Sequence, residues 1–326
     1  MRLCRFEQDW TGHWGIVEGD VVYALEGDPY GVPDRGPAVG RLSALAAAAE
    51  RPAREGGLRL LAPAAPGTIW SNGANYPSRC LERNVPPPAA PGFLWSPGTM
   101  ICGTGTEIGI PEAETRSEYG AELGVVVRRD CRDVSVAAAA DAILGYTALN
   151  NIWSKDPDRV APERPMRVYD NHCPTGPLLV TGDELDWRNR RVRLWVDGAL
   201  RQEDTTSSMR FSPAFLVSYL SRTVTIRQGD LLMTGTPGGV EGNRLRFGQT
   251  VEVEIDGIGR LRNHVTRVDD ATPTFIVSVQ TWIERGGADA RRAAPGRRGA
   301  PAGPSGSRNN ARDTGAAAPA AARRRS

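Results

Sequence analysis

The chain has 326 residues, 40% of them hydrophobic and 24% charged, an ordinary globular balance that excludes a wholly disordered or fibrous protein. The formal net charge of +2 argues against a dedicated nucleic-acid binder. The charge is uneven, because residues 286–326 hold nine Arg and two Asp, a net +7, which leaves −5 for residues 1–285.

Cysteine usage and hydropathy point to the cytoplasm. The five cysteines are odd in number and widely spaced, so neither a zinc site nor a disulfide framework is indicated. The first ten residues are polar and charged, unlike a signal peptide, and no apolar run is long enough to predict a transmembrane helix. We therefore expect a cytoplasmic protein that binds neither nucleic acid nor membranes.

Residues 1–64 are predicted to form a small N-terminal α/β domain. Apolar runs on either side of Gly19-Asp20 predict a β-hairpin, within a group of two or three strands. The Ala-rich segment 41–52 predicts a helix after them.

Residues 65–268 are predicted to form a β-rich α+β core, because short, turn-bounded strand patterns outnumber helical ones. One helix is expected after Ser135, with Gly145 just past its end. A second is expected after Ser212, with Pro213 at its first position. We assign residues 269–285 to a C-terminal extension of the core.

Residues 286–326 consist largely of Ala, Gly, Pro, Arg and Ser, and we predict that they are disordered. A basic tail can bind nucleic acid or membranes. A dispensable extension is the interpretation we favour.

Two segments suggest chemistry. On a continuous strand, Glu118, Gly120 and Glu122 would share one face, and two carboxylates on one face can bind a hard cation. A solvated edge strand is the alternative. Gly238 and Gly239 follow a strand without the lysine of a P-loop, so they allow close backbone approach or form a tight turn.

Six ordered motifs carry a resemblance to a known family: YGAELGVVV, GYTALNNIWSKD, YDNHCPTGPLLV, VDGALRQEDTTSSMRF, GDLLMTGTPGGV and GQTVEVEIDGIGRLRN. In this order they resemble the fumarylacetoacetate hydrolase family, over roughly residues 1–268. The resemblance implies a mixed β-roll, a homodimer and a bound Mg²⁺ or Mn²⁺. It also implies β-dicarbonyl or 2-oxo acid substrates that undergo C–C hydrolysis, decarboxylation or keto–enol isomerisation.

The metal positions depart from the family pattern. Gly120 stands where the family has its first Glu ligand, Glu122 keeps the second, and Asn151 replaces the Asp of the third. Hard cations favour several carboxylate oxygens, so we expect no metal or weakly bound Mg²⁺ or Mn²⁺. If a metal binds, its ligands are expected to be Glu122, Asn151 and Glu118.

The catalytic positions depart as well. Arg79 replaces the water-activating His, its partner Glu82 is kept, and Arg167 replaces the active-site Lys. An Arg stays protonated and cannot be a general base, but it can hold a carboxylate or enolate. The chain has one lysine, Lys155, so drift from Lys to Arg with loss of function is the plainer alternative.

The resemblance also suggests substrate-binding positions. They are Tyr76, Trp95, Arg201, Gln202 and Thr236. Trp95 and Trp153 stand where the family has Lys and a small residue, which favours an aromatic, more apolar pocket, although core packing explains Trp153 equally well.

From these residues we expect a divergent enzyme that acts on a small anionic carbonyl compound, in specialised metabolism. Arg79 and Arg167 would hold the substrate while Glu82 or Glu122 moves a proton. Tautomerisation, decarboxylation or cyclisation fits this set better than C–C cleavage. A metal-dependent hydrolase or isomerase of the usual family type, and a non-catalytic ligand-binding or dimerisation relative, are the alternatives.

Overall fold

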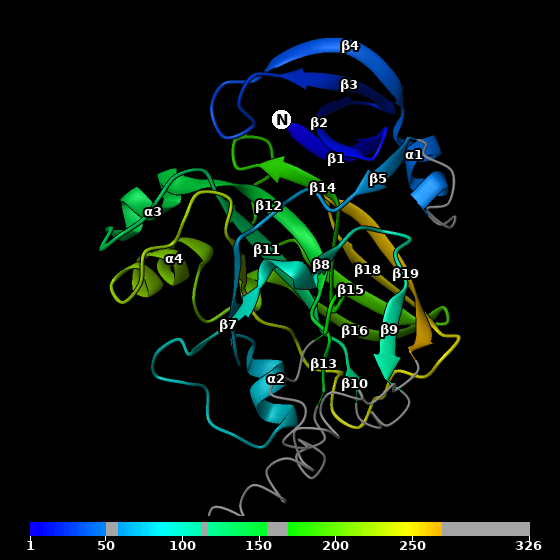
Figure 1. Ribbon diagram of the computed structural model, residues 1–326. Coiled ribbons are helices and arrows are strands. Elements are labelled where there is room, and N and C mark those ends of the chain that lie inside the picture. Colours follow the sequence, from blue (N-terminus) through cyan, green and yellow to red (C-terminus); the bar gives the residue numbers. More distant parts are fainter. Residues whose placement is uncertain (50–57, 112–116, 155–168, 269–326) are drawn as a thin grey trace, which may run out of the picture. The chain divides into compact units, whose positions relative to one another are not determined.

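The computed structural model describes residues 1–49, 58–111, 117–154 and 169–268. Strands dominate these residues and form one 12-stranded, one five-stranded and one two-stranded sheet (Figure 1). The expected β-rich α+β class is confirmed.

The N-terminal residues form four strands, a helix and a short fifth strand. These are β1 (Arg2–Gln8), β2 (Thr11–Glu18), β3 (Val21–Glu26), β4 (Asp34–Arg41), α1 (Leu42–Ala49) and β5 (Arg59–Leu61). The predicted hairpin is present, with Glu18 opposite Val21 across its two-residue turn. Two or three strands were expected, and β4 was not among them. Its Gly and Pro residues interrupt the alternating apolar pattern by which strands are predicted.

The largest sheet joins the N-terminal strands to the core. Its order is β4-β3-β2-β1-β14-β12-β11-β17-β6-β7, with β5 and β8 (Ile101–Cys102) attached at its side. The core strands are β6 (Thr68–Asn72), β7 (Phe93–Pro97), β11 (Ala121–Val127), β12 (Ile143–Asn150), β14 (Cys173–Thr181) and β17 (Leu231–Met233). Strand β17 runs parallel to β6 and antiparallel to β11. The ends of β6 and β17 therefore meet the start of β11 at one edge.

The five-stranded sheet has the order β16-β15-β18-β19-β9. Its strands are β9 (Ile108–Pro111), β15 (Arg191–Val196), β16 (Ala199–Thr205), β18 (Thr250–Ile255) and β19 (Gly259–Val268). Side chains of this sheet share a core cluster with Val125 of β11 and Val180 of β14, whereas Val126 and Leu179 belong to a second cluster. Both faces of the central strands are thus buried, which explains their continuous apolar runs.

The helices follow their predicted caps. Ser135 accepts a hydrogen bond from the Ala138 amide at the start of α3 (Val136–Ala142), and Ser212 accepts one from Phe215 at the start of α4 (Pro213–Ser221). Helix α3 is shorter than its pattern suggested, because Ile143 already begins β12. Helices α3 and α4 lie side by side (Figure 1). The short helix α2 (Pro77–Glu82) follows β6.

The expectation that Glu118 and Glu122 share one strand face is wrong. Glu118 ends β10 (Ser117–Glu118), which pairs with β13 (Trp153–Ser154) in the two-stranded sheet, whereas Glu122 belongs to β11. The amide of Gly120 donates to the Asn150 side chain, so its hydrogen bond leaves the strand ladder.

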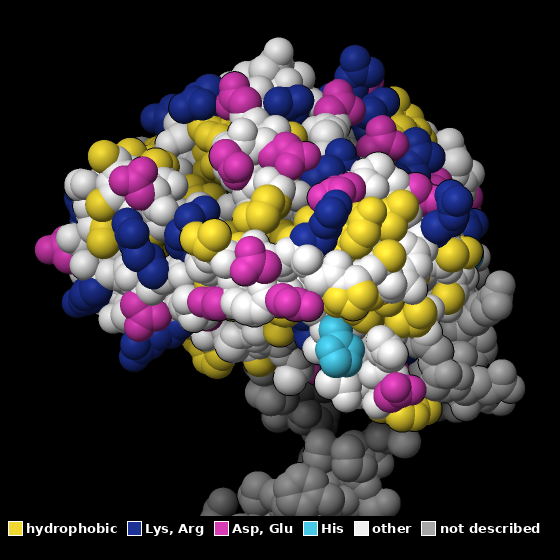
Figure 2. Space-filling view, turned by 90° about the horizontal axis from the view of Figure 1, so that it is seen from above, with side chains coloured by type: hydrophobic (Ala, Val, Ile, Leu, Met, Phe, Trp, Pro, Cys, Tyr) yellow, Lys and Arg dark blue, Asp and Glu magenta, His cyan; other side chains and the backbone are white. Residues whose placement is uncertain are grey.

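The visible surface is mixed in character. The face in Figure 2 carries acidic and basic side chains interspersed with hydrophobic ones, without a broad area of one sign. All five cysteines are buried and free. None of the helices in the described ranges is long and apolar enough to cross a membrane. Residues 269–326, including the predicted disordered tail, lie outside the described residues, as does Arg167.

Candidate active site

A cavity of about 400 Å³ lies at the sheet edge where β6 and β17 end and β11 begins. It brings together four residues that the sequence predicted for the site, namely Arg79, Glu122, Asn151 and Thr236. The rest of its described wall consists of Ser71, Asn72, Gly73, Ala74, Arg83, Leu94, Ser96, Met100 and Trp153. One part of this wall is polar, and Leu94, Met100 and Trp153 supply an apolar part.

Glu122 is the most deeply buried carboxyl group of the cavity, with 2% of its surface exposed. Its Oε1 accepts a hydrogen bond from Asn151 Nδ2 at 2.9 Å, and its Oε2 accepts one from the Gly235 amide at 2.6 Å. Burial raises the pKa of Glu122 to about 7, although these two donors favour the charged form. Burial thus brings the pKa of Glu122 from its ordinary acidic value toward neutral pH.

Arg79 reaches the cavity from helix α2, but acidic side chains already surround its guanidinium group. Its Nη1 lies 2.5 Å from Glu82 and 3.4 Å from Glu241, and its Nη2 lies 3.9 Å from Glu118. Arg79 is buried, so these ion pairs are little screened by water. An anionic ligand must compete with them for the guanidinium.

The Glu82 carboxylate accepts hydrogen bonds from backbone amides of the loop after β17. Its Oε1 accepts hydrogen bonds from three consecutive amides, those of Gly239, Val240 and Glu241, at 2.8–3.0 Å. Burial raises the pKa of Glu82, but the Arg79 hydrogen bond and the backbone donors outweigh it, and the pKa lies below its ordinary value. Glu82 therefore fastens the Gly-rich loop to α2 as a permanent carboxylate.

Gln202 also holds the loop after β17 in place, through hydrogen bonds that link it to the start of β11. Its Oε1 accepts from the Ala121 amide at 2.9 Å, which leaves Nε2 to donate to Thr236 Oγ1 at 2.9 Å and to the Pro237 carbonyl at 2.9 Å. Because Thr236 accepts this bond, its own hydroxyl proton can point into the cavity. The side chain of Gln202 is buried and does not line the cavity, so the structure gives it a supporting position behind Thr236.

Trp95 does not line the cavity among the described residues. Leu94 and Ser96 of strand β7 do so, and strand alternation directs the intervening Trp95 to the opposite face, where it pairs with Trp70. Of the two predicted tryptophans, Trp153 is the one in the cavity wall.

Two further predicted residues also lie outside the described cavity wall. Tyr76 is fully buried at the start of α2, and burial raises the pKa of its hydroxyl group far above the ordinary value. Arg201 is exposed on β16, next to Gln202.

Comparisons with known proteins identify the family of the chain. The family model described as "Fumarylacetoacetate (FAA) hydrolase C-terminal" matches residues 68–266, and the one described as "Rv2993c-like, N-terminal" matches residues 1–63. The chain belongs to the fumarylacetoacetate hydrolase family.

Its relatives in this family include hydrolases, isomerases and a tautomerase. A 2,4-didehydro-3-deoxy-L-rhamnonate hydrolase of Sphingomonas sp. is 33% identical over 82% of this chain and 96% of its own length. A mitochondrial oxaloacetate tautomerase of Xenopus laevis is 34% identical over 64% of this chain and 68% of its own. The solved structure of a 5-carboxymethyl-2-hydroxymuconate delta-isomerase from Mycobacterium smegmatis has a TM-score of 0.70 at 31% identity, covering 82% of this chain and 100% of that one.

The metal site of the fumarylacetoacetate hydrolase family is poorly matched here. Both carboxylate oxygens of Glu122 accept hydrogen bonds from N–H groups, one of them from the Asn151 amide at the position of the family's Asp ligand. The described residues contain no group of three or more His, Cys, Asp and Glu side chains able to hold a metal ion. Glu118 has its Oε2 3.9 Å from Arg79 and is not part of the cavity wall. These donors do not fit a hard cation.

Gly120 adds a steric obstacle at the position of the family's first ligand. A Cβ atom built on Gly120 would lie 3.0 Å from the Cβ and the Oγ1 of Thr236. A Glu at this position would therefore require Thr236 to move by a few tenths of an ångström. Thr236 itself is held by Gln202.

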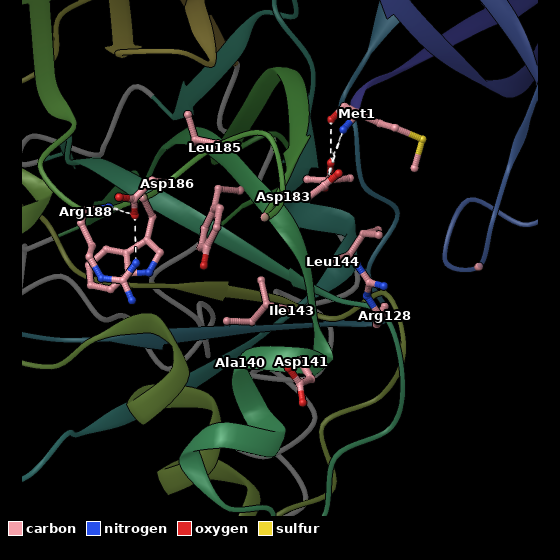
Figure 3. A pocket seen from close by; sticks show the side chains of 15 residues that line it. Met1, Arg128, Ala140, Asp141, Ile143, Leu144, Asp183, Leu185, Asp186 and Arg188 are labelled. Carbon is pink, nitrogen blue, oxygen red and sulfur yellow. Dashed lines mark hydrogen bonds and ion pairs between the residues drawn. The ribbon is translucent and has the colours of Figure 1, made fainter.

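A second, larger pocket of about 700 Å³ lies beside the start of β12 and the loop after β14 (Figure 3). None of the predicted site residues lines it. Two of its charged groups pair with each other, since Arg188 Nη1 lies 3.0 Å from Asp186 Oδ1 in a largely exposed contact. The smaller cavity, which four of the predicted residues line, is therefore the candidate active site.

Proposed function

We propose that the protein is an enzyme that transfers a proton on a small 2-oxo acid or β-dicarbonyl substrate, with Glu122 as the proton carrier and without a required metal ion. The observation that carries this proposal is the buried Glu122 carboxyl group, whose pKa is raised to about 7 beside a cavity. A catalytic acid–base group works best when its pKa lies near the working pH. Keto–enol tautomerisation needs such a group and little else.

Glu82 is the less suitable proton carrier. Its pKa lies below the ordinary value, because Arg79 and three backbone amides stabilise the carboxylate. A group that stays ionised at neutral pH holds a proton too rarely to act as an acid. Of the two carboxyl groups considered from the sequence, we therefore assign the proton to Glu122.

The other cavity residues support binding of an anionic carbonyl compound. Arg79 offers a buried guanidinium group, for which an anionic ligand competes with the acidic side chains around it. The Thr236 hydroxyl can donate to a carbonyl or enolate oxygen. The apolar wall of Leu94, Met100 and Trp153 suits a carbon chain. The names of the relatives agree with this class, since one is an oxaloacetate tautomerase and another a hydroxymuconate isomerase.

Hydrolysis of a C–C bond is a poorer match. The chain has three histidines, and none of them lines the described cavity. The buried imidazole of His172, for example, makes a 3.0 Å hydrogen bond from Nε2 to the Gly109 carbonyl. A water molecule in the cavity would therefore lack the usual imidazole base.

The test measures the conversion of an enol to its keto form in the presence of EDTA, with enol-oxaloacetate as the first substrate. In the reaction Glu122 gives its proton to carbon, the enol O–H gives its proton to water, and the Glu122 carboxylate takes a proton back from water. We expect catalysis by the wild type and a loss of about 10²- to 10⁴-fold in Glu122→Gln, the usual contribution of a general acid–base group. The matched control is Glu203→Gln, at an exposed position outside the cavity, which should leave the rate unchanged. No catalysis by the wild type with any 2-oxo acid would favour a non-catalytic relative.

A further inference from the structure

Asn72 is a cavity residue that none of the sequence motifs singled out. It is the last residue of β6, it lines the cavity, and only 3% of its surface is exposed. Its Nδ2 donates to the Thr234 carbonyl at 3.3 Å, whereas its Oδ1 has no hydrogen-bond partner among the described residues. A buried acceptor without a hydrogen-bond donor lowers the free energy of unfolding, so the presence of one in a folded protein needs an explanation.

The orientation of this amide is fixed by its neighbour. The Thr234 carbonyl can only accept hydrogen bonds, so turning the Asn72 amide over would place one oxygen against another. Asn75 Nδ2 also donates to the same carbonyl, at 2.8 Å. The atom of Asn72 that lacks a hydrogen-bond partner among the described residues is therefore the acceptor Oδ1. A group that binds there must donate a hydrogen bond.

We infer that Asn72 is a specificity-determining residue that accepts a hydrogen bond from a hydroxyl group of the substrate. The inference rests on the proposed function and narrows it to 2-oxo acids that carry a hydroxyl group on their carbon chain. Arg79 and Thr236 provide donors for the carboxylate and carbonyl oxygens, whereas Asn72 provides a neutral acceptor. A site with a buried acceptor discriminates strongly against an analogue that lacks the matching donor.

The position of Asn72 agrees with this role. Strand β17 separates β6 from β11, so Asn72 and Glu122 approach the cavity from opposite sides of the Thr234-Gly235 turn. A substrate that spans the cavity can thus place its reacting carbon near Glu122 and a hydroxyl group near Asn72.

The experiment compares Asn72→Leu with the wild type, because leucine has a similar shape and no polar atoms. The Thr234 carbonyl keeps its bond from Asn75, so the variant should fold and melt at the same or a higher temperature. Dissociation constants are measured by calorimetry for 2-oxo acids in matched pairs that differ by one hydroxyl group, such as 2-oxobutanoate and 4-hydroxy-2-oxobutanoate. Asn72→Ala serves as the second variant if Asn72→Leu does not fold.

In the wild type we expect at least one hydroxylated acid to bind tenfold or more tightly than its partner, and this preference to fall below about threefold in the variant. If the wild type shows no such preference, or if the preference survives the substitution, the inference is overturned. A bound water molecule would then be enough to donate the hydrogen bond to Asn72 Oδ1. Binding of both pair members that depends on Glu122 but not on Asn72 would leave the proposed function standing. A wild type that binds and converts none of these acids would refute the proposed function, and this inference with it.

Discussion

Asn151 Nδ2 donates a hydrogen bond to Glu122 Oε1 at 2.9 Å, so a neutral amide, not a second carboxylate, lies against the Glu122 carboxyl group. This contact joins Asn151, which departs from the family pattern, to Glu122, which keeps it. The amide partly compensates the buried carboxylate, as a cation would, but burial still dominates and the pKa of Glu122 is raised to about 7. On the proposed function, Glu122 carries a proton at a position where the family binds a metal ion.

The first prediction concerns metal binding. After removal of metals with EDTA, millimolar Mg²⁺ or Mn²⁺ should change the stability of the wild type by far less than a specific ligand would. A ligand at 100 times its dissociation constant adds about 2.7 kcal/mol to the free energy of unfolding. Thermal unfolding with and without the metal measures the effect. A shift of that size that disappears in Glu122→Gln would contradict a metal-independent site.

A reconstructed site provides the positive control for this measurement. Gly120→Glu combined with Asn151→Asp restores two carboxylates beside Glu122, so the double variant should gain Mg²⁺-dependent stability. Thr236 must shift to admit the new side chain at position 120, so we expect the variant to be less stable than the wild type without metal.

The second prediction is a pH dependence of stability that originates from Glu122. Burial raises its pKa from 4.5 to about 7, so the folded protein binds this proton more tightly than the unfolded chain does. The free energy of unfolding that the group contributes therefore falls as pH rises from about 4.5 to 7, and is level above that. At about 1.36 kcal/mol per pKa unit, the loss between pH 5 and pH 8 is about 2–3 kcal/mol.

Urea unfolding of the wild type and of Glu122→Gln at the two pH values measures this loss. The variant cannot titrate at position 122, so its stability should change less between pH 5 and pH 8, by the stated amount. Equal changes in both proteins would mean that the Glu122 pKa is not raised.

The third prediction concerns the loop that Glu82 holds. Glu82→Gln removes the charge that binds three amides and Arg79. The free energy of unfolding should therefore fall by about 1.5–3 kcal/mol, the range for hydrogen bonds to a charged group. Urea unfolding provides the measurement, with the exposed Glu203→Gln as the matched control. A change no larger than that of the control would argue against the anchoring role.

Much of the fold was accessible from the sequence because local rules govern it. The caps at Ser135 and Ser212 and the hairpin at Gly19-Asp20 depend on a few neighbouring residues, and all three are present. The break between β10 and β11 could not be predicted from the sequence. It depends on Gly120 bonding to the side chain of Asn150, a residue from another strand.

In the candidate site, too, some features could be predicted from the sequence and others depend on contacts between distant residues. The motifs led to Arg79, Glu122, Asn151 and Thr236, all of which line the cavity. They did not reveal that three backbone amides occupy Glu82, because that contact joins residues more than 150 positions apart. Asn72 was overlooked for a related reason, since an unpartnered oxygen becomes visible only when every neighbour is placed.

The most direct test of metal-independent proton transfer by Glu122 is the pH dependence of deuterium exchange at C3 of a 2-oxo acid, measured as kcat/KM in EDTA. Removal of a proton from carbon needs the carboxylate form, so the rate should rise with pH, with an apparent pKa near 7, and then level off. Added Mg²⁺ should leave this profile unchanged, and Glu122→Gln should abolish it. Exchange that requires Mg²⁺, or a profile that persists in Glu122→Gln, would contradict the account.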